Sequence, residues 1–111
     1  MPTQLPTDQN NLPIPALRLK DGRAHKITVG AASARNSVGF ESDTQIISLY
    51  TTVPVFIRLG TGSVTATTSD HYFPAGTYYD IAVGGDGVAQ STHIAVLRES
   101  SDGILYVSEK T

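Results

Sequence analysis

The apolar residues of this chain recur with the two-residue period of β-strands, and no helical period is present. The clearest segment is 53–59, where Val53, Val55, Ile57 and Leu59 fall on one face of an extended chain. Short runs of the same kind predict strands at 25–29, 38–40, 44–50, 63–68, 77–83, 92–98 and 104–108. About eight short strands predict an all-β fold, a single antiparallel β-sandwich, with a jelly roll as the connectivity we favour.

Turn residues separate the expected strands and fix how neighbouring strands connect. Proline and glycine in the run Phe73-Pro74-Ala75-Gly76 fit a tight turn. The last two segments, 92–98 and 104–108, are expected to form a hairpin across residues 100–103.

Residues 1–17 have the character of an arm. Four prolines remove amide donors from this segment and bias it towards extended conformations. Its leucines and isoleucine, Leu5, Leu12, Ile14 and Leu17, are spaced along it as apolar anchors. We therefore predict an extended Pro-rich N-terminal arm at 1–17 that docks on a partner, and a β-sandwich (jelly-roll-like) domain at 18–111; a frayed terminus is the alternative.

The composition narrows the function. A chain of 111 residues with 40% hydrophobic residues has material for one core. Charged residues make up 16%, below the usual quarter, which indicates that much of the surface faces protein. The net charge of −2 argues against general nucleic-acid binding. No segment has the pattern of a signal peptide or a membrane span, so no membrane partner is expected.

The charges are unevenly distributed. Residues 18–35 carry five basic side chains against Asp21 alone, whereas residues 41–111 carry three basic side chains against eight acidic ones. Scattered surface charge is one interpretation. The other is that the basic start of the domain docks onto an acidic neighbour or a second copy. Candidate contact residues there are Arg18, Lys20 and Arg23.

No residue pattern supports catalysis. His25, His71 and His93 are far apart in the chain and form no local metal motif, and cysteine is absent. Ser69, Asp70 and His71 are adjacent, so on an extended chain their side chains alternate between faces and cannot form a relay. The glycine-rich segment 84–87 lacks the carboxylates or lysine of a calcium or phosphate loop. We expect no enzyme activity, no metal and no cofactor.

Five tyrosines leave two interpretations open. They are Tyr50, Tyr72, Tyr78, Tyr79 and Tyr106. They can form a sugar-binding platform, or they can lie at sheet edges and interfaces, where the ring is buried and the hydroxyl is hydrated.

Three segments carry a resemblance to a known family. They are Val55–Gly60, Val64–Gly76 with its terminal Phe-Pro-Ala-Gly, and Ile104–Glu109 with its Leu-Tyr-Val. Together with the Pro-rich start, they resemble the small capsid decoration (staple, or cement) proteins of short-tailed bacteriophages of the epsilon-fifteen type. The resemblance covers residues 53–109 and does not extend to the arm.

The resemblance implies that this protein functions by binding other proteins. Proteins of this family are jelly-roll dimers on the outside of a phage capsid, where they bridge subunits of the major capsid protein and strengthen the shell. We therefore expect a virion structural protein on the capsid surface, with the major capsid protein and a second copy as partners. The alternative is a viral head spike or fibre, or a receptor (glycan)-binding β-domain.

Overall fold

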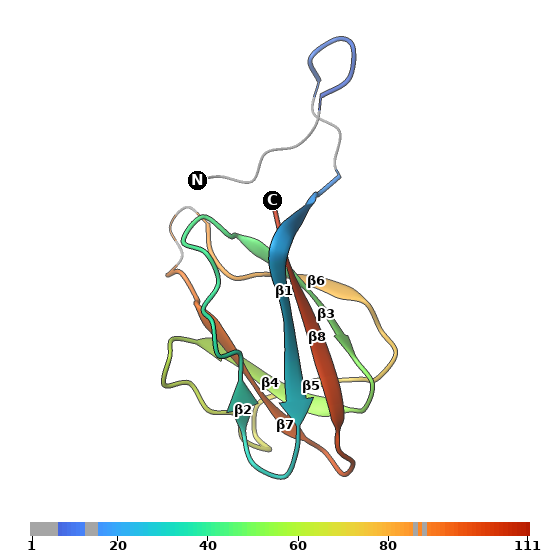
Figure 1. Cartoon of the computed structure of the whole chain (residues 1–111), viewed down its shortest axis with the longest axis vertical. Coiled ribbons are helices and arrows are strands. Elements are labelled where there is room, and N and C mark those ends of the chain that lie inside the picture. Colours follow the sequence, from blue (N-terminus) through green and yellow to red (C-terminus); the bar gives the residue numbers. More distant parts are fainter. Residues whose placement is uncertain (1–6, 13–15, 86, 88) are drawn as a thin grey trace.

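The chain folds into two antiparallel sheets of four strands each, packed face to face (Figure 1). The computed structural model describes residues 7–12, 16–85, 87 and 89–111. The strands are β1 (Leu19–Val29), β2 (Ala34–Arg35), β3 (Ile46–Thr51), β4 (Val55–Gly60), β5 (His71–Phe73), β6 (Tyr79–Ala82), β7 (His93–Arg98) and β8 (Gly103–Lys110). The predicted all-β sandwich is thus confirmed. The described residues include no helix long and apolar enough to cross a bilayer.

The chain passes repeatedly from one sheet to the other. One sheet has the strand order β1-β8-β3-β6 and the other has the order β2-β7-β4-β5. The predicted hairpin of residues 92–98 and 104–108 is therefore wrong, because β7 and β8 belong to different sheets. Each of these strands sends its alternate apolar side chains into the same core from opposite sides.

Side chains alternate between the inner and outer face of each strand, and the inward ones form a core between the sheets. Strand β4 starts directly after Pro54, which lacks an amide donor, and buries Val55 and Ile57 on its inner face. The buried core residues are Ile27, Val29, Phe40, Ile47, Leu49, Val55, Ile57, Phe73, Val83, Ile94, Val96, Leu105 and Val107.

Two expected strands are absent: local hydrogen bonds hold residues 63–68 in turns, and the Phe40 amide donates to the Thr92 carbonyl outside any strand ladder. Residues 63–68 turn: the Val64 amide donates to the Thr61 carbonyl, and the Thr67 amide donates to the Asp70 carboxylate. Residues 38–40 also lie outside the strands, although Phe40 is buried. The short strands β2 and β5 take their places in the second sheet.

The described part of the N-terminal segment does not extend. One carboxylate oxygen of Asp8 accepts hydrogen bonds from the amides of Asn10 and Leu12, at 2.8 and 3.0 Å. The Asp8 amide in turn donates to the Leu12 carbonyl at 2.9 Å. Residues 8–12 therefore close into a loop, which stands apart from the sheets in Figure 1. The described chain then resumes at residue 16, and Arg18 and Thr111 exchange two backbone hydrogen bonds beside the start of β1.

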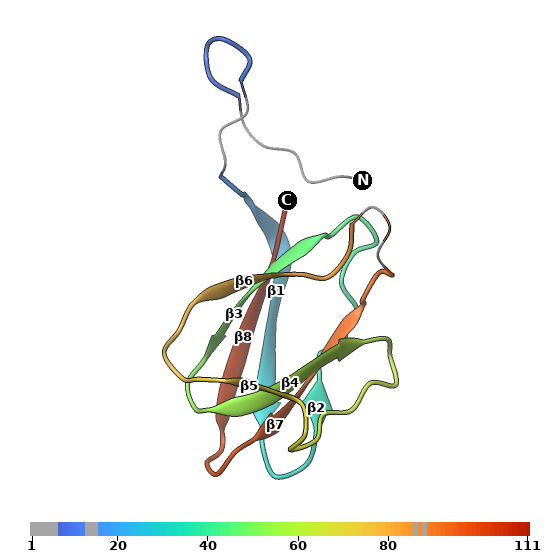
Figure 2. The same cartoon turned by 180° about the vertical axis from the view of Figure 1, so that it is seen from behind.

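The two long sides of the sandwich differ. On one side, the edge strands β1 and β2 lie in contact with each other. On the other side, the sheets end in the short strands β5 and β6, which Figure 2 shows at some distance from each other. Residues of β4, β5 and β6 line an accessible cleft on this second side.

Candidate interaction surfaces

The structure describes five of the seven predicted contact residues. Leu5 and Ile14 lie outside the described residues. Leu12 is 60% exposed in the closed loop, Leu17 is half-buried, and Arg18 is exposed at the start of the domain.

Lys20 and Arg23 pair within the chain. The Lys20 ammonium lies 2.7 Å from Asp43 and 3.2 Å from Glu41, and its side chain is only 12% exposed. Burial by itself lowers the pKa of Lys20, but the hydrogen bonds to Asp43 and Glu41 outweigh it and raise that pKa above its ordinary value. Both cations thus meet carboxylates from the acidic part of the sequence, so two of the five basic side chains at 18–35 are paired inside the molecule.

Glu109 is the centre of a group of charged and polar residues that we call the ionic cluster. Its members are Lys20, Arg23, His25, Glu41, Asp43, Thr44 and Glu109. The Glu109 side chain is fully buried, and each carboxylate oxygen accepts two hydrogen bonds. One oxygen accepts from Arg23 Nε at 2.9 Å and lies 2.7 Å from His25 Nε2. The other accepts from the Thr44 hydroxyl at 2.6 Å and the Glu41 amide at 2.8 Å. Burial raises the pKa of Glu109, but these bonds and the Arg23 charge together lower it below its ordinary value.

The ionic cluster lies beside an irregularity in the pairing of β1. The pairing of β1 with β8 shifts between Leu19 and Ala24, so that residues 20–23 bulge from the ladder. Gly22, at φ +75°, lies within this bulge. The bulge brings Lys20 and Arg23 to the carboxylates, so their role in this structure is to join β1 to β8 and to the 39–44 segment.

Three tyrosines lie on the outer face of the β1-β8-β3-β6 sheet, and we call them the tyrosine face. Tyr50 of β3 is directly opposite Tyr106 of β8, and both rings are about two-fifths exposed. Tyr78 precedes β6, and the Lys110 ammonium lies 4.8 Å from its ring centroid. Hydrogen bonds with Ser48 and Lys110 lower the pKa of Tyr78.

The other two tyrosines lie elsewhere. Tyr72 of β5 packs its ring edge-on against Phe56, on the second sheet. Burial and the neighbouring Glu99 raise the pKa of Tyr72. Tyr79 of β6 contacts the Phe73 ring, with centroids 6.5 Å apart. The five tyrosines therefore do not form a single platform.

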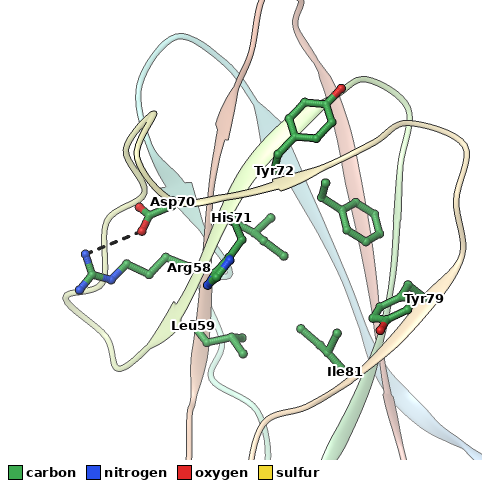
Figure 3. A pocket seen from close by; sticks show the side chains of 9 residues that line it. Arg58, Leu59, Asp70, His71, Tyr72, Tyr79 and Ile81 are labelled. Atoms are coloured by element: carbon green, nitrogen blue, oxygen red, sulfur yellow. Dashed lines mark ion pairs between the residues drawn. The ribbon is translucent and has the colours of Figure 1, made fainter.

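An accessible cleft opens between β5 and β6, and we call it the edge cleft (Figure 3). It has a volume of about 700 Å³. Its walls are mainly apolar, and its lining residues are Ile57, Arg58, Leu59, Asp70, His71, Tyr72, Phe73, Tyr79 and Ile81. In Figure 3, Leu59, His71 and Ile81 point into this space, whereas the ring of Tyr72 points away from it.

Charged groups of both signs stand at the rim of the edge cleft. Arg58 is 60% exposed and lies 4.0 Å from Asp70, its one ion-pair partner in the described part of the chain. Asp70 accepts hydrogen bonds from the amide and hydroxyl of Thr67, so it holds the loop before β5. The Ser69-Asp70-His71 run thus provides a turn and two lining residues of the cleft, Asp70 and His71.

The histidines are separated, as their spacing indicates. His25 lies in the ionic cluster, His71 in the edge cleft, and His93 beside the Thr92 hydroxyl. Over the described ranges, no group of three or more histidine or acidic side chains is arranged to hold a metal ion.

Both the ionic cluster and the edge cleft were missed from the sequence. A signal for the cluster exists, because Glu109 takes the next inward position of its strand after Leu105 and Val107. The edge cleft depends on which strands end each sheet, and the local pattern does not contain that information.

Comparisons with known proteins identify no relative. No family model, no curated protein and no solved structure matches this chain.

Proposed function

We propose that this protein is a virion structural protein that decorates the outside of a phage capsid and staples neighbouring subunits of the major capsid protein. The observation that carries the proposal is the tyrosine face. Tyr50, Tyr78 and Tyr106 are exposed on a rigid sheet, and tyrosine is enriched in protein interfaces. The low charge of the chain supports the same conclusion.

We interpret the fold as a jelly roll. The strand orders β1-β8-β3-β6 and β2-β7-β4-β5 support this, because in each sheet strands distant in sequence are neighbours. Such a domain is a rigid block with two broad outer faces. In our proposal it acts by contact, without catalysis and without a cofactor, as a dimer on the capsid surface.

The test is to add the purified protein to capsid shells that lack it. Wild-type protein should bind the shells and raise the temperature at which they release DNA, because each copy bridges subunits and many copies act together. Replacing Tyr50 and Tyr106 together by alanine should weaken shell binding at least about tenfold. Val38→Ala, at an exposed apolar side chain outside both the tyrosine face and the edge cleft, is the control and should bind as wild type. Absence of the protein from purified virions, or equal survival of shells with and without it, would overturn the proposal.

One observation favours a second candidate, a glycan-binding head spike or fibre domain. The adjacent rings of Tyr50 and Tyr106 form a small exposed aromatic surface of the kind on which sugar rings stack. A glycan array separates the two functions: a hit that the double alanine variant loses supports this candidate, and an array without a hit removes it.

A further inference from the structure

Both sheets end on the same side of the sandwich in a short edge strand. Strand β5 pairs with β4, and β6 pairs with β3, and within the described residues neither has a second neighbouring strand. An edge strand presents unpaired backbone N–H and C=O groups to any strand that approaches. We call β5, β6 and the edge cleft between them the open edge.

The open edge also exposes apolar surface that belongs to the core. Ile81 of β6 is opposite the fully buried Ile47 of β3, yet it is only half-buried and lines the edge cleft. Tyr79, opposite the fully buried Leu49, is 56% exposed. Side chains that face inward on β6 therefore remain accessible, and covering them removes apolar surface from water.

The opposite side of the sandwich has features that prevent edge pairing. Strand β1 carries the bulge at residues 20–23 and the exposed Lys26 on its outer face, and β2 covers part of its length. Bulges, charges and covering elements are the devices that natural sheets use to block edge-to-edge contact. Strand β6 has no bulge, and its one charged residue, Asp80, is paired with Lys110.

The rim charges make the open edge complementary to itself. Arg58 and Asp70 lie on the same rim at 4.0 Å, a loose pair in which Arg58 remains largely exposed. In a contact about a two-fold axis, the same patch meets itself, and each charge faces the other patch. A patch with one cation and one anion at its rim can satisfy both across such an axis, whereas a partner of single-signed charge leaves one of them opposed.

We propose that a second copy of this chain covers the open edge about a two-fold axis, with β6 of each copy running antiparallel to the other. Tyr79 and Ile81 of each copy then close the edge cleft of its partner. The pairing joins the two β1-β8-β3-β6 sheets into one continuous sheet of eight strands. The inference rests on the proposed function in one respect: the dimer presents two tyrosine faces side by side, as a staple requires.

The first experiment measures the oligomeric state of the full-length protein by sedimentation velocity. The wild type should shift from monomer to dimer as its concentration rises towards about 100 μM. Tyr79→Lys should raise the dimer dissociation constant at least about tenfold, because it places two like charges at the two-fold contact. The matched control is Tyr106→Lys, which introduces the same charge at an exposed tyrosine away from the open edge and should leave the dimer intact. Thermal unfolding of both variants verifies that each is folded.

A second experiment does not depend on destabilising the contact. The chain contains no cysteine, so a single cysteine at Ala82 of β6 is a unique attachment point. A short bis-maleimide should link Ala82→Cys protein into covalent dimers with high yield. Lys26→Cys, on exposed β1, should give only background linkage.

The outcomes separate this inference from the proposed function. A wild type that is monomeric throughout, equal dissociation of the two lysine variants, or equal linkage at Ala82 and Lys26 would each overturn the open-edge dimer. If the protein is a monomer yet binds shells, the open-edge dimer and the dimeric form in the proposed function both fail, whereas the capsid function stands. If the dimer forms through β6 but the protein does not bind shells, only the capsid function fails.

Discussion

The two long sides of this sandwich are both made of edge strands, but one side is joined to its neighbours and the other is accessible. On the β1 side, a bulge and a buried ionic cluster join the edge strand to its neighbours. On the β6 side, the inward face continues the core pattern but lacks a covering element, so the edge cleft remains accessible. The charged groups of the β1 side are thus paired within one chain, whereas the β6 side leaves apolar groups of the core accessible, and these are the groups that the proposed second copy would cover.

The chemistry of the two sides explains why they differ. Charged groups inside the β1 side are fully satisfied, and no side-chain nitrogen or oxygen that is buried in the described residues lacks a hydrogen-bond partner. Such a network resists partial opening, since any displaced group leaves another one buried and unpaired. The β6 side contains mostly apolar groups, which can exchange water for a partner without that penalty.

The largest expected effect comes from breaking the ionic cluster on the β1 side. Glu109→Gln should lower the free energy of unfolding at pH 7 by about 3 kcal/mol, because it leaves Arg23 and His25 without their buried carboxylate. Urea denaturation measures this difference. The control is Asp102→Asn, which removes an exposed pair with Arg98 and should change stability little.

The same variant predicts a pH dependence. The pKa of Glu109 in the folded protein lies below the ordinary value of 4.5, so ionisation of Glu109 stabilises the fold fully above that value. This stability is lost as the pH falls through the folded-state pKa. The difference between wild type and Glu109→Gln should therefore shrink on acidification below about pH 4. A difference that is independent of pH would mean that the carboxylate charge is not what stabilises this side.

A smaller effect is expected from two residues that face each other across β3 and β6, the buried Ile47 and the half-buried Ile81. Ile47→Ala should cost about 2–5 kcal/mol, since it opens a cavity in a fully buried site. Ile81→Ala, directly opposite, should cost about 2 kcal/mol less in the monomer, because its side chain already contacts solvent. Denaturation at low protein concentration measures both. Equal costs at every concentration would contradict an accessible edge cleft, and a cost for Ile81→Ala that rises with concentration would support the dimer.

The sequence predicts the faces of strands better than their partners. The inward positions of Val55 and Ile57, and of Ile27 and Val29, follow from a local period of two and are correct. The hairpin of the last two strands is wrong because pairing is decided by the whole sheet. Sheet membership depends on contacts between residues far apart in the chain, which no local pattern contains.

The candidate surfaces were harder to predict for the same reason. Leu12, Arg18 and the tyrosines could be named as exposed contact residues from their types, but not grouped, because grouping requires the register of three strands. Lys20 and Arg23 are basic residues of the type found in docking patches, and their carboxylate partners lie 18 to 86 positions further along the chain.

The smallest expected effect tests whether the β1 side depends on its bulge. Gly22 has φ +75°, and a Cβ there would meet no atom within 4 Å, so Gly22→Ala isolates the strain of a left-handed backbone. It should destabilise the protein by about 1 kcal/mol, measured by thermal or urea unfolding. Gly30→Ala is the matched control, because a Cβ at Gly30 also meets nothing within 4 Å and Gly30 is not among the glycines with positive φ. If the two variants are equally stable, the bulge relaxes without a cost in stability. If only Gly22→Ala is destabilised, the bulge that brings Lys20 and Arg23 to their carboxylates is a fixed part of the β1 side.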